Sequence, residues 1–450
     1  MADVLLREIG DAFGVGLDDL FEVVGDDTLP AYFDVTGLAA MSFGVAGMML
    51  SRFCNEPVTV TVDQHLASLW FGLSMRPSGW QLPPIWDAVA GDYRAGDGWI
   101  RLHTNAPHHR AAAIAVLDVE EDRDAVACAV AGWDAEALET AIVEAGGCAA
   151  VMHSFEHWTK HPQGAAVAKE PLIIWMEHQA IKARAPRQRY QRPLQGVRVL
   201  DLTRVLAGPA ATRFLAGFGA DVLRIDPPGW DEAVAVQEMT LGKRCARLDL
   251  ENDDDRIIFE ALLAKADVLV HGYRDGALAG LGYGLTERHV LNPGLIDVRL
   301  NAYGWSGPWS GRRGFDSLVQ MSSGIADFGM KQAGTDKPFP LPVQALDHGT
   351  GYLMAAAVLH ALDLREREGR VLSAKLSLAR TAQLLAGTCR KKMSDGLPAE
   401  TEMDVDPWLE ETVWGTARRA RFPLMEGMAP SWSYPAGPLG TSPPVWLEDA

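Results

Sequence analysis

The chain has few cysteines, and their arrangement excludes two common structural devices. Its 450 residues contain five, an odd number with no C-x-x-C pair: Cys54, Cys128, Cys148, Cys245 and Cys389. Paired cysteines would be needed for a disulfide framework, and closely spaced ones for a cysteine-based zinc site. We therefore expect neither, and a reducing cytoplasm is the compartment that fits best.

Positive charge and long apolar runs are also scarce. Lysine and arginine number 41 against 59 acidic residues, a net charge of −18, which argues against nucleic acids and anionic membranes as partners. The first residues carry acids inside their apolar stretch, unlike a signal peptide. The longest apolar stretches, residues 38–50 and 353–362, fall short of a membrane span. We expect both to form buried helices.

A dinucleotide fingerprint is missing where it would be expected. Residues 197–202 read as a strand, 210–218 as a helix and 220–225 as a second strand, the opening of a Rossmann-like parallel sheet. The intervening turn reads LAGPAA, without G-x-G-x-x-G, which disfavours a nicotinamide cofactor. Free N–H groups near the helix start, with Arg204 and Arg213 close by, suit another anionic ligand. An ordinary turn is the alternative.

The rest of the chain divides by pattern. Strands at 247–250, 267–270, 295–300 and 371–376 alternate with helices at 253–266 and 350–366. This predicts a doubly wound parallel sheet over residues 194–390. Before it we expect a helical extension (1–29), a smaller α+β domain (30–181) and a basic linker (182–193). The smaller domain should contain a strand at 58–62, a hairpin turning at 96–98, and helices to about residue 176; an acidic, proline-rich tail (391–450) should pack back on the fold.

A weak internal repeat links the two halves. Residues 33–53, followed by 58–70, resemble residues 346–367, followed by 371–385. Both read helix, strand, helix. Chance similarity between apolar helices is the alternative.

Several segments together resemble the family III CoA transferases of the CaiB/BaiF type. They are PLQGVRVLDLTRVLAGPAATRFLAGFGADVLRIDPPGWDE, GKRCARLDLEN, ADVLVHGYRDGALAGLGYG, NPGLIDVRLNAYGWSGPWSGRRGFDSLVQMSSG and ALDHGTGYLMAAAVLHALDLREREGR. They follow the family's order over residues 193–385. The earlier segments GDYRAGDGWIRLHT and AGGCAAVMHSFEHWTKHPQ resemble the family's later, small-domain portion. The resemblance thus implies a degenerate first copy, with the small domain placed ahead of the sheet.

The resemblance implies an enzyme that moves CoA from an acyl-CoA to a free carboxylic acid. The reaction would pass through an aspartyl anhydride and an aspartyl-CoA thioester. Asp347 matches the nucleophile; alternatively, it caps a helix that starts near Thr350. In the first-half repeat Phe33 stands at that position and Asp34 is one place off, so we expect one site per chain. CoA thioester is then a substrate, and we expect no tightly bound cofactor.

Two other functions stay open. Asp316 matches an acid that racemases of this family pair with histidine, although Phe315 stands where the histidine would be and His289 is out of register. An isomerase similar to α-methylacyl-CoA racemase, using Asp316 as a second acid, is therefore one alternative. A catalytically degenerate CoA-binding partner subunit is the other.

Contacts with CoA are also implied by the resemblance. The matching positions are Val205, Leu206, Ala207, Leu248, Gly272 and Tyr273. The basic residues that could contact its phosphates are Lys243, Arg244, Arg274 and Arg313. Tyr273 would stack on adenine or pack in the core.

We expect no metal and no membrane partner. His103, His108 and His109 lie close together in the sequence but lack a regular ligand spacing. The resemblance implies a homodimer, and leaves open whether fused halves keep the family's interlocked form.

Overall fold

The computed structural model describes residues 2–16, 21–54, 59–183, 192–274, 276–390, 392–393, 395–424 and 429–447. Most of the predicted basic linker, residues 184–191, lies outside these described residues.

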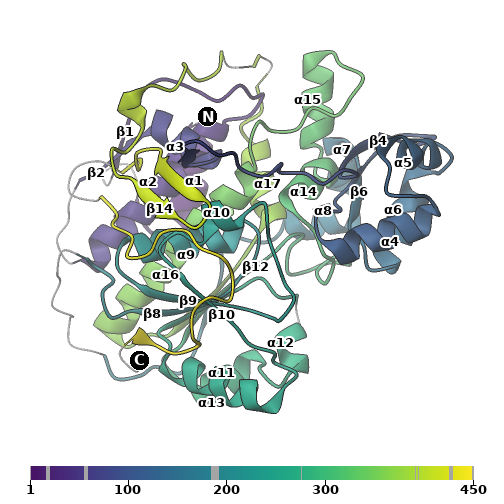
Figure 1. Cartoon of the computed structure of the whole chain (residues 1–450). Helices are drawn as coiled ribbons and strands as arrows, with labels where there is room; N and C mark the ends of the chain where they lie inside the picture. Colours follow the sequence, from purple (N-terminus) through teal and green to yellow (C-terminus); the bar gives the residue numbers. More distant parts are fainter. Residues whose placement is uncertain are drawn as a thin grey trace.

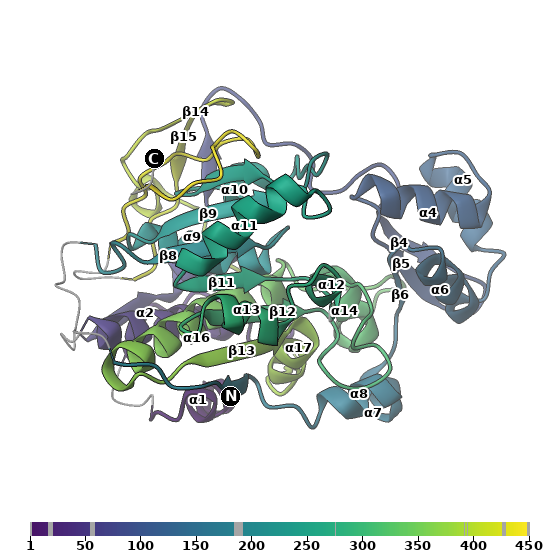
Figure 2. The ribbon, with the colours of Figure 1, turned by 90° about the horizontal axis from the view of Figure 1, so that it is seen from below.

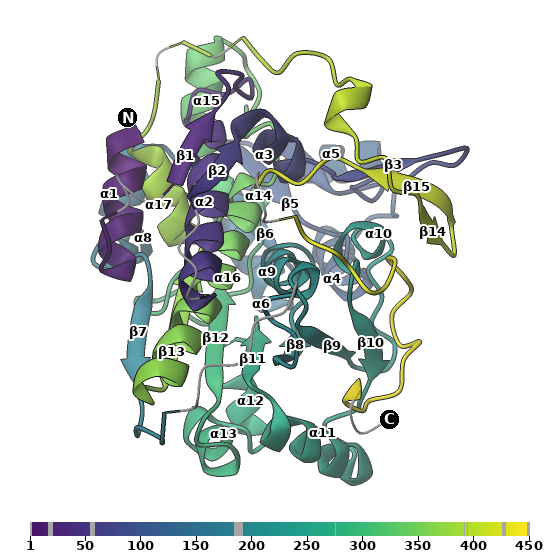
Figure 3. The same cartoon turned by 90° about the vertical axis from the view of Figure 1, so that its left-hand side faces the viewer.

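A seven-stranded sheet forms the centre of the second half (Figure 3). Its order is β10-β9-β8-β11-β12-β13-β7, and the first six strands run parallel. These are β8 (Arg198–Leu202), β9 (Asp221–Asp226), β10 (Arg244–Arg247), β11 (Val268–His271), β12 (Ile296–Asn301) and β13 (Leu372–Ser377). The predicted strand at 247–250 is wrong, because the chain turns at Asp249, whose N–H bonds to Asp255 at 2.7 Å.

Helices cover both faces of this sheet, as Figure 3 shows. Alternate side chains of a strand point to opposite faces. Val199 joins the core beneath α9 (Ala207–Gly217) and α16 (Ala345–Glu368), whereas Leu200 joins a second core beneath α11 (Asp253–Lys265). Short helices α12 (Ala277–Gly280) and α13 (Leu285–Leu291) connect β11 to β12. The prediction of a mixed α/β fold with a parallel sheet is confirmed.

The first half contributes directly to this core. Helix α2 (Val35–Phe53) packs along α16, and β7 (Ile174–Glu177) adds an antiparallel edge strand beside β13. By length and composition α2 could cross a membrane, contrary to the expectation from residues 38–50, but 89% of that window is buried inside the protein. The two halves therefore share one hydrophobic core.

The element order of the predicted repeat is present. Helix α2 is followed by β2 (Val60–Asp63) and α3 (Gln64–Phe71), as α16 is followed by β13 and α17 (Leu378–Ala386). Strand β2, however, pairs with β1 (Phe21–Val24) outside the central sheet. Helix α1 (Ala2–Phe13) ends before β1, so the expectation that residues 1–29 are only helical is wrong. The run FEVV is apolar enough to pair with β2.

A smaller antiparallel sheet projects from one side of the molecule (Figures 1 and 2). It consists of β4 (Gly91–Arg94), β5 (Trp99–Leu102) and β6 (Ala149–Val151). Its helices are α4 (Pro107–Leu117), α5 (Arg123–Val130) and α6 (Ala135–Glu144). The hairpin is present, but the prediction of helices alone up to residue 176 is wrong, because β6 and β7 lie within that stretch.

The small sheet docks onto the second half. Ala150 of β6 and Cys148, just before that strand, pack against α14 (Asp316–Ser322). Their contacts there are Leu318 and Met321. Helices α7 (Phe155–Lys160) and α8 (Pro162–Val167) continue the chain, and α7 contacts α15 (Ile325–Ala333). This docking brings residues of the small domain next to the start of α14.

The tail also packs on the fold. Strands β14 (Glu410–Thr412) and β15 (Gly415–Arg419) form a sheet with β3 (Met75–Pro77), near the short helix α10 (Val236–Met239). A 3-10 helix (Glu402–Asp404) precedes them.

Candidate active site

Asp347 lies inside the first turn of α16, not before the helix. The helix begins at Ala345, so the prediction of a start near Thr350 is wrong. Glycine is a poor helix former. Gly351 is nevertheless inside the helix, because α9 packs so closely that a Cβ there would lie 2.4 Å from the Ala207 carbonyl oxygen. Because Gln344 is the N-cap residue, the capping alternative for Asp347 has no support.

A second buried acid holds the main chain of Asp347. The Asp347 N–H donates to Oδ2 of Asp316 at 2.9 Å, and Gln320 Nε2 donates to the other oxygen at 2.5 Å. Gln320 is itself fixed by the N–H of Leu341 at 2.8 Å. In the part of the chain that the structure describes, the Asp347 carboxyl has no hydrogen-bond partner. Asp316 is therefore anchored, and the Asp347 carboxyl is free.

Burial raises the pKa of both acids. For Asp347, which is 7% exposed, the nearby Asp316 carboxylate raises the pKa further, well above its usual value. For Asp316, the hydrogen bonds from Gln320 and from the Asp347 N–H oppose the effect of burial on the pKa. Such hydrogen bonds stabilise the ionised form. Asp316 is thus the acid whose ionised form is better stabilised, and Asp347 is the more basic of the two.

A basic cavity of about 430 Å³ opens on one side of Asp347. It lies beyond the carboxyl ends of β8, β11 and β12, where strand order reverses and where such folds bind ligands. Its arginines are Arg204, Arg274, Arg312 and Arg313. Arg312 is paired with Glu139 at 2.9 Å. The local positive charge that an anionic ligand would need is present despite the acidic chain.

A larger, mostly apolar cavity of about 690 Å³ opens on the other side. Its apolar lining includes Phe71, Leu73, Pro83, Pro84, Ile85, Trp86, Leu206, Met321, Pro340, Leu341 and Val343. Asp347, Val205, Trp230 and Phe315 line both cavities. The Asp347 carboxyl therefore stands at their junction.

Most of the predicted CoA contacts lie at these cavities. Those lining the basic cavity are Val205, Ala207, Gly272, Tyr273, Arg274 and Arg313, while Leu206 lines the apolar one. Tyr273 accepts a hydrogen bond from Arg204 at 3.2 Å, with its ring 5.4 Å from that guanidinium.

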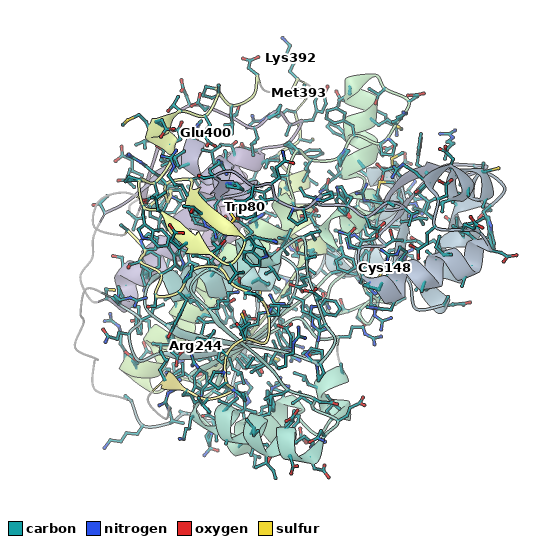
Figure 4. The ribbon with its side chains drawn as sticks, in the orientation of Figure 1. Trp80, Cys148, Arg244, Lys392, Met393 and Glu400 are labelled. Atoms are coloured by element: carbon teal, nitrogen blue, oxygen red, sulfur yellow. The ribbon has the colours of Figure 1, made fainter. Side chains whose placement is uncertain are left out.

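Three of the predicted contact residues line neither cavity. Lys243 is buried, with its Nζ 3.0 Å from Asp201. Arg244 pairs with Asp221 at 2.8 Å beside the C-terminal segment, far from the small domain (Figure 4). Leu248 packs in the core beneath α11. The two charges are neutralised within the fold, so neither is available to a ligand.

The turn after β8 is strained at Val205. Its φ of 65° is left-handed, which a β-branched residue rarely adopts. Its N–H donates to Glu232 at 2.9 Å, and this bond holds the turn. The predicted turn therefore has a fixed, strained conformation at the site. Local sequence could not reveal this strain.

Sequence reasoning missed two side chains at the cavities. The Trp230 ring lies 4.3 Å from the Arg204 guanidinium, and Trp230 belongs to the family-like segment that ends in PPGWDE. His348 stacks on Phe71 at 5.4 Å, and burial lowers its pKa to about 3. Both side chains lie in segments that resemble the family, and this position in the sequence was the signal that could have identified them.

The candidate histidines lie in different places. His289 contacts the carbonyls of Leu285 and Leu295 and lines neither cavity, so it is not placed to act with Asp316. His103 stacks on Phe315 at 3.7 Å in the apolar cavity, whereas His108 and His109 line the basic one.

The fold and site define an α/β protein with a free, buried carboxyl between a basic and an apolar cavity. Residues 194–403 match the model of CoA-transferase family III, in agreement with the resemblance. The matched segment contains the six parallel strands of the central sheet, and also Asp316 and Asp347.

The similar curated proteins are CoA transferases by name. An acetyl-coenzyme A transferase of Hypoxylon pulicicidum is 36% identical over 45% of this chain and 34% of its own. The probable fatty acyl-CoA transferase Rv3272 of Mycobacterium tuberculosis is 34% identical over 40% and 48%. A formyl-CoA:oxalate CoA-transferase of Escherichia coli is 28% identical over 49% and 54%. The chain thus spans about half or less of their length.

A crystal structure of Rv3272 from Mycobacterium tuberculosis superposes with a TM-score of 0.38. It is 30% identical and covers 44% of this chain and 57% of that chain.

Proposed function

We propose that this protein transfers CoA from an acyl-CoA to a free carboxylic acid, with Asp347 as the nucleophile. The observation that carries the proposal is the Asp347 carboxyl at the junction of the two cavities. A thioester bound there would have its CoA portion on the basic side and its acyl group on the apolar side. The names of the similar proteins support the same reaction class.

The proposed steps conserve the thioester energy. An Asp347 carboxylate oxygen attacks the thioester carbonyl carbon, the C–S bond breaks, and CoA leaves as a thiolate from a mixed anhydride. The thiolate attacks the aspartyl carbonyl, which releases the first acid and leaves an aspartyl-CoA thioester. The acceptor carboxylate attacks that thioester, the C–S bond breaks, and CoA thiolate leaves from a second anhydride. CoA thiolate then attacks the acceptor's acyl carbon and frees Asp347.

The surroundings suit these intermediates. An anhydride hydrolyses readily in water, and the apolar lining limits water around the reacting carboxyl. Arginines of the basic cavity would hold the CoA phosphates. Asp316 positions the nucleophile by fixing the N–H of Asp347.

The test is exchange of isotopic label between a free acid and its CoA thioester. Asp347→Ala should abolish exchange, and mass spectrometry of the wild-type protein with acyl-CoA should find a CoA or acyl adduct on Asp347. The matched control is Asp34→Asn at the corresponding end of α2, where asparagine can still cap the helix. Undiminished exchange in Asp347→Ala would contradict the proposal. Solvent deuterium at the α-carbon without an acceptor acid would instead indicate the isomerase.

A further inference from the structure

A third cavity, of about 740 Å³, lies between the small domain and residues 308–313 of the second half, and Asp347 is not part of its lining. Glu136 and Glu139 of α6 line it, together with His153, His157 and His161. The proposed CoA transfer uses none of these side chains. Figure 1 shows α6 and α7 on the small-domain side of the molecule.

The three histidines repeat every four residues, as in a helix. Ser154 caps α7, and His153 just before it stacks on His157 one turn later, with ring centroids 4.0 Å apart. His161 follows after another turn, its ring 6.2 Å from His157 and 6.1 Å from His153. Residues four apart share one helix face. The imidazoles therefore gather on one side of this segment.

Glu136 brings a carboxylate to the same point from another helix. The ligand atoms of Glu136, His153 and His157 all lie within 4.8 Å of one another. Among the described residues, none of these three side chains has a hydrogen-bond or ion-pair partner. By contrast, Glu139, on the next turn of α6, is occupied by Arg312 at 2.9 Å and the N–H of Val151 at 3.0 Å. Glu139 thus compensates the charge of Arg312, while Arg274 and Arg313 also line the cavity.

We propose that Glu136, His153 and His157 bind a divalent transition-metal ion, with Zn²⁺ as the best match. Two imidazoles and one carboxylate form a familiar zinc ligand set, with an open fourth position. Zinc bonds of about 2 Å require ligand atoms about 3.3 Å apart, so modest side-chain rotations would close the site.

His161 is the available fourth protein ligand. Its Nδ1 accepts the N–H of Gln163 at 3.1 Å, which leaves Nε2 for the ion. A hydrogen bond to the other ring nitrogen is the usual way to orient a liganding histidine. The ion would connect α6 of the small domain to α7, which contacts α15 of the second half. Its role is to clamp the domains, and no step of CoA transfer passes through it.

The test is titration of the full chain with Zn²⁺, after purification without a polyhistidine tag and removal of metals by a chelator. Calorimetry should give one ion per chain, and Co²⁺ should give the visible spectrum of a tetrahedral site. His157→Gln and Glu136→Gln should each weaken binding by at least tenfold. Both side chains are exposed, so folding should survive.

The matched control is His289→Gln. His289 stacks on His178 at 3.8 Å, as His153 does on His157, but it contacts main-chain carbonyls. This variant should bind Zn²⁺ like the wild type. Zn²⁺ should also raise the thermal midpoint of the wild type and not that of Glu136→Gln. Equal affinity in Glu136→Gln and wild type, or no binding by the wild type, would overturn the proposal, whatever the outcome for CoA transfer.

Discussion

The main-chain N–H of Asp347 donates a 2.9 Å hydrogen bond to the carboxylate of Asp316. One acid thus receives the donors, while the other keeps a free carboxyl in a buried position. Because no described residue stabilises the charge of Asp347, its ionisation should cost folding free energy. Reactivity and instability then have the same origin at this residue.

Asp347→Asn should therefore be more stable than the wild type at neutral pH, by about 1 kcal/mol. Burial and the Asp316 charge raise the pKa of Asp347. The folded wild type thus holds this proton more tightly than the unfolded chain, and it loses stability as pH rises above 3.8 toward the raised pKa. In urea denaturation, the stability advantage of the variant should therefore be larger at neutral pH than at about pH 4.

Asp34→Asn is the control for this stability gain. Asp34 caps α2 and pairs with Arg390 at 2.8 Å, so its charge is stabilised. Its substitution should give no gain with pH. An Asp347→Asn variant of unchanged stability at both pH values would contradict the argument.

Asp316→Asn should shift the acidic limb of the kcat/KM profile for CoA exchange to lower pH. Removing the like charge lowers the pKa of Asp347, so its carboxylate forms at lower pH. Loss of one hydrogen bond to Gln320 or to Asp347 should also reduce kcat. A merely structural role would reduce activity equally at every pH, with no shift of the limb.

Arg313→Gln should raise KM for the acyl-CoA roughly tenfold with a smaller change in kcat. In the described part of the chain Arg313 has no acidic partner, and it lines the basic cavity. Its charge is therefore available to a phosphate. Arg244→Gln is the control, because Arg244 is paired with Asp221. Equal changes in KM for both variants would refute this assignment.

Local pattern predicted the elements that carry the site, and long-range contacts decided which side chains reach it. The apolar run at 197–202 and the turn after it suffice to place Val205 and Ala207 at the start of α9. Lys243 looked available, yet its partner Asp201 lies 42 residues away on β8. Local sequence does not show which cation is neutralised inside the fold, because the neutralising partner lies far away along the chain.

The start of α16 illustrates a second limit. Gly349 and Gly351 lie in the first two turns of this helix, although glycine is a poor helix former. In the structure these glycines admit neighbours: a Cβ at Gly349 would lie 2.9 Å from Leu38, and one at Gly351 would meet α9. Close helix packing explains these two glycines, and it depends on partners that lie more than 140 residues away in the sequence.

A buried ionic network joins the tail to helices α9 and α10. Glu238 of α10 contacts Arg213 of α9 and Arg419 of β15, the latter at 3.0 Å, and it accepts the Ser74 hydroxyl at 2.5 Å. Burial alone would raise the pKa of Glu238. The two guanidinium groups outweigh it and lower the pKa to about 2.

Glu238→Gln should destabilise the protein by about 3 to 5 kcal/mol at neutral pH, because it leaves the buried Arg213 without its charge partner, while Arg419 keeps Glu410. The lowered pKa means that the charged form stabilises the fold above the usual pKa of 4.5, and that this stability is lost as pH falls through about 2. The difference in unfolding free energy between variant and wild type, measured by urea denaturation, should thus become smaller as the pH is lowered. Glu402→Gln, at an exposed ion pair with Arg418, should change little. A gap that is independent of pH would mean that the charge of Glu238 contributes nothing, and that its hydrogen bonds alone hold the tail.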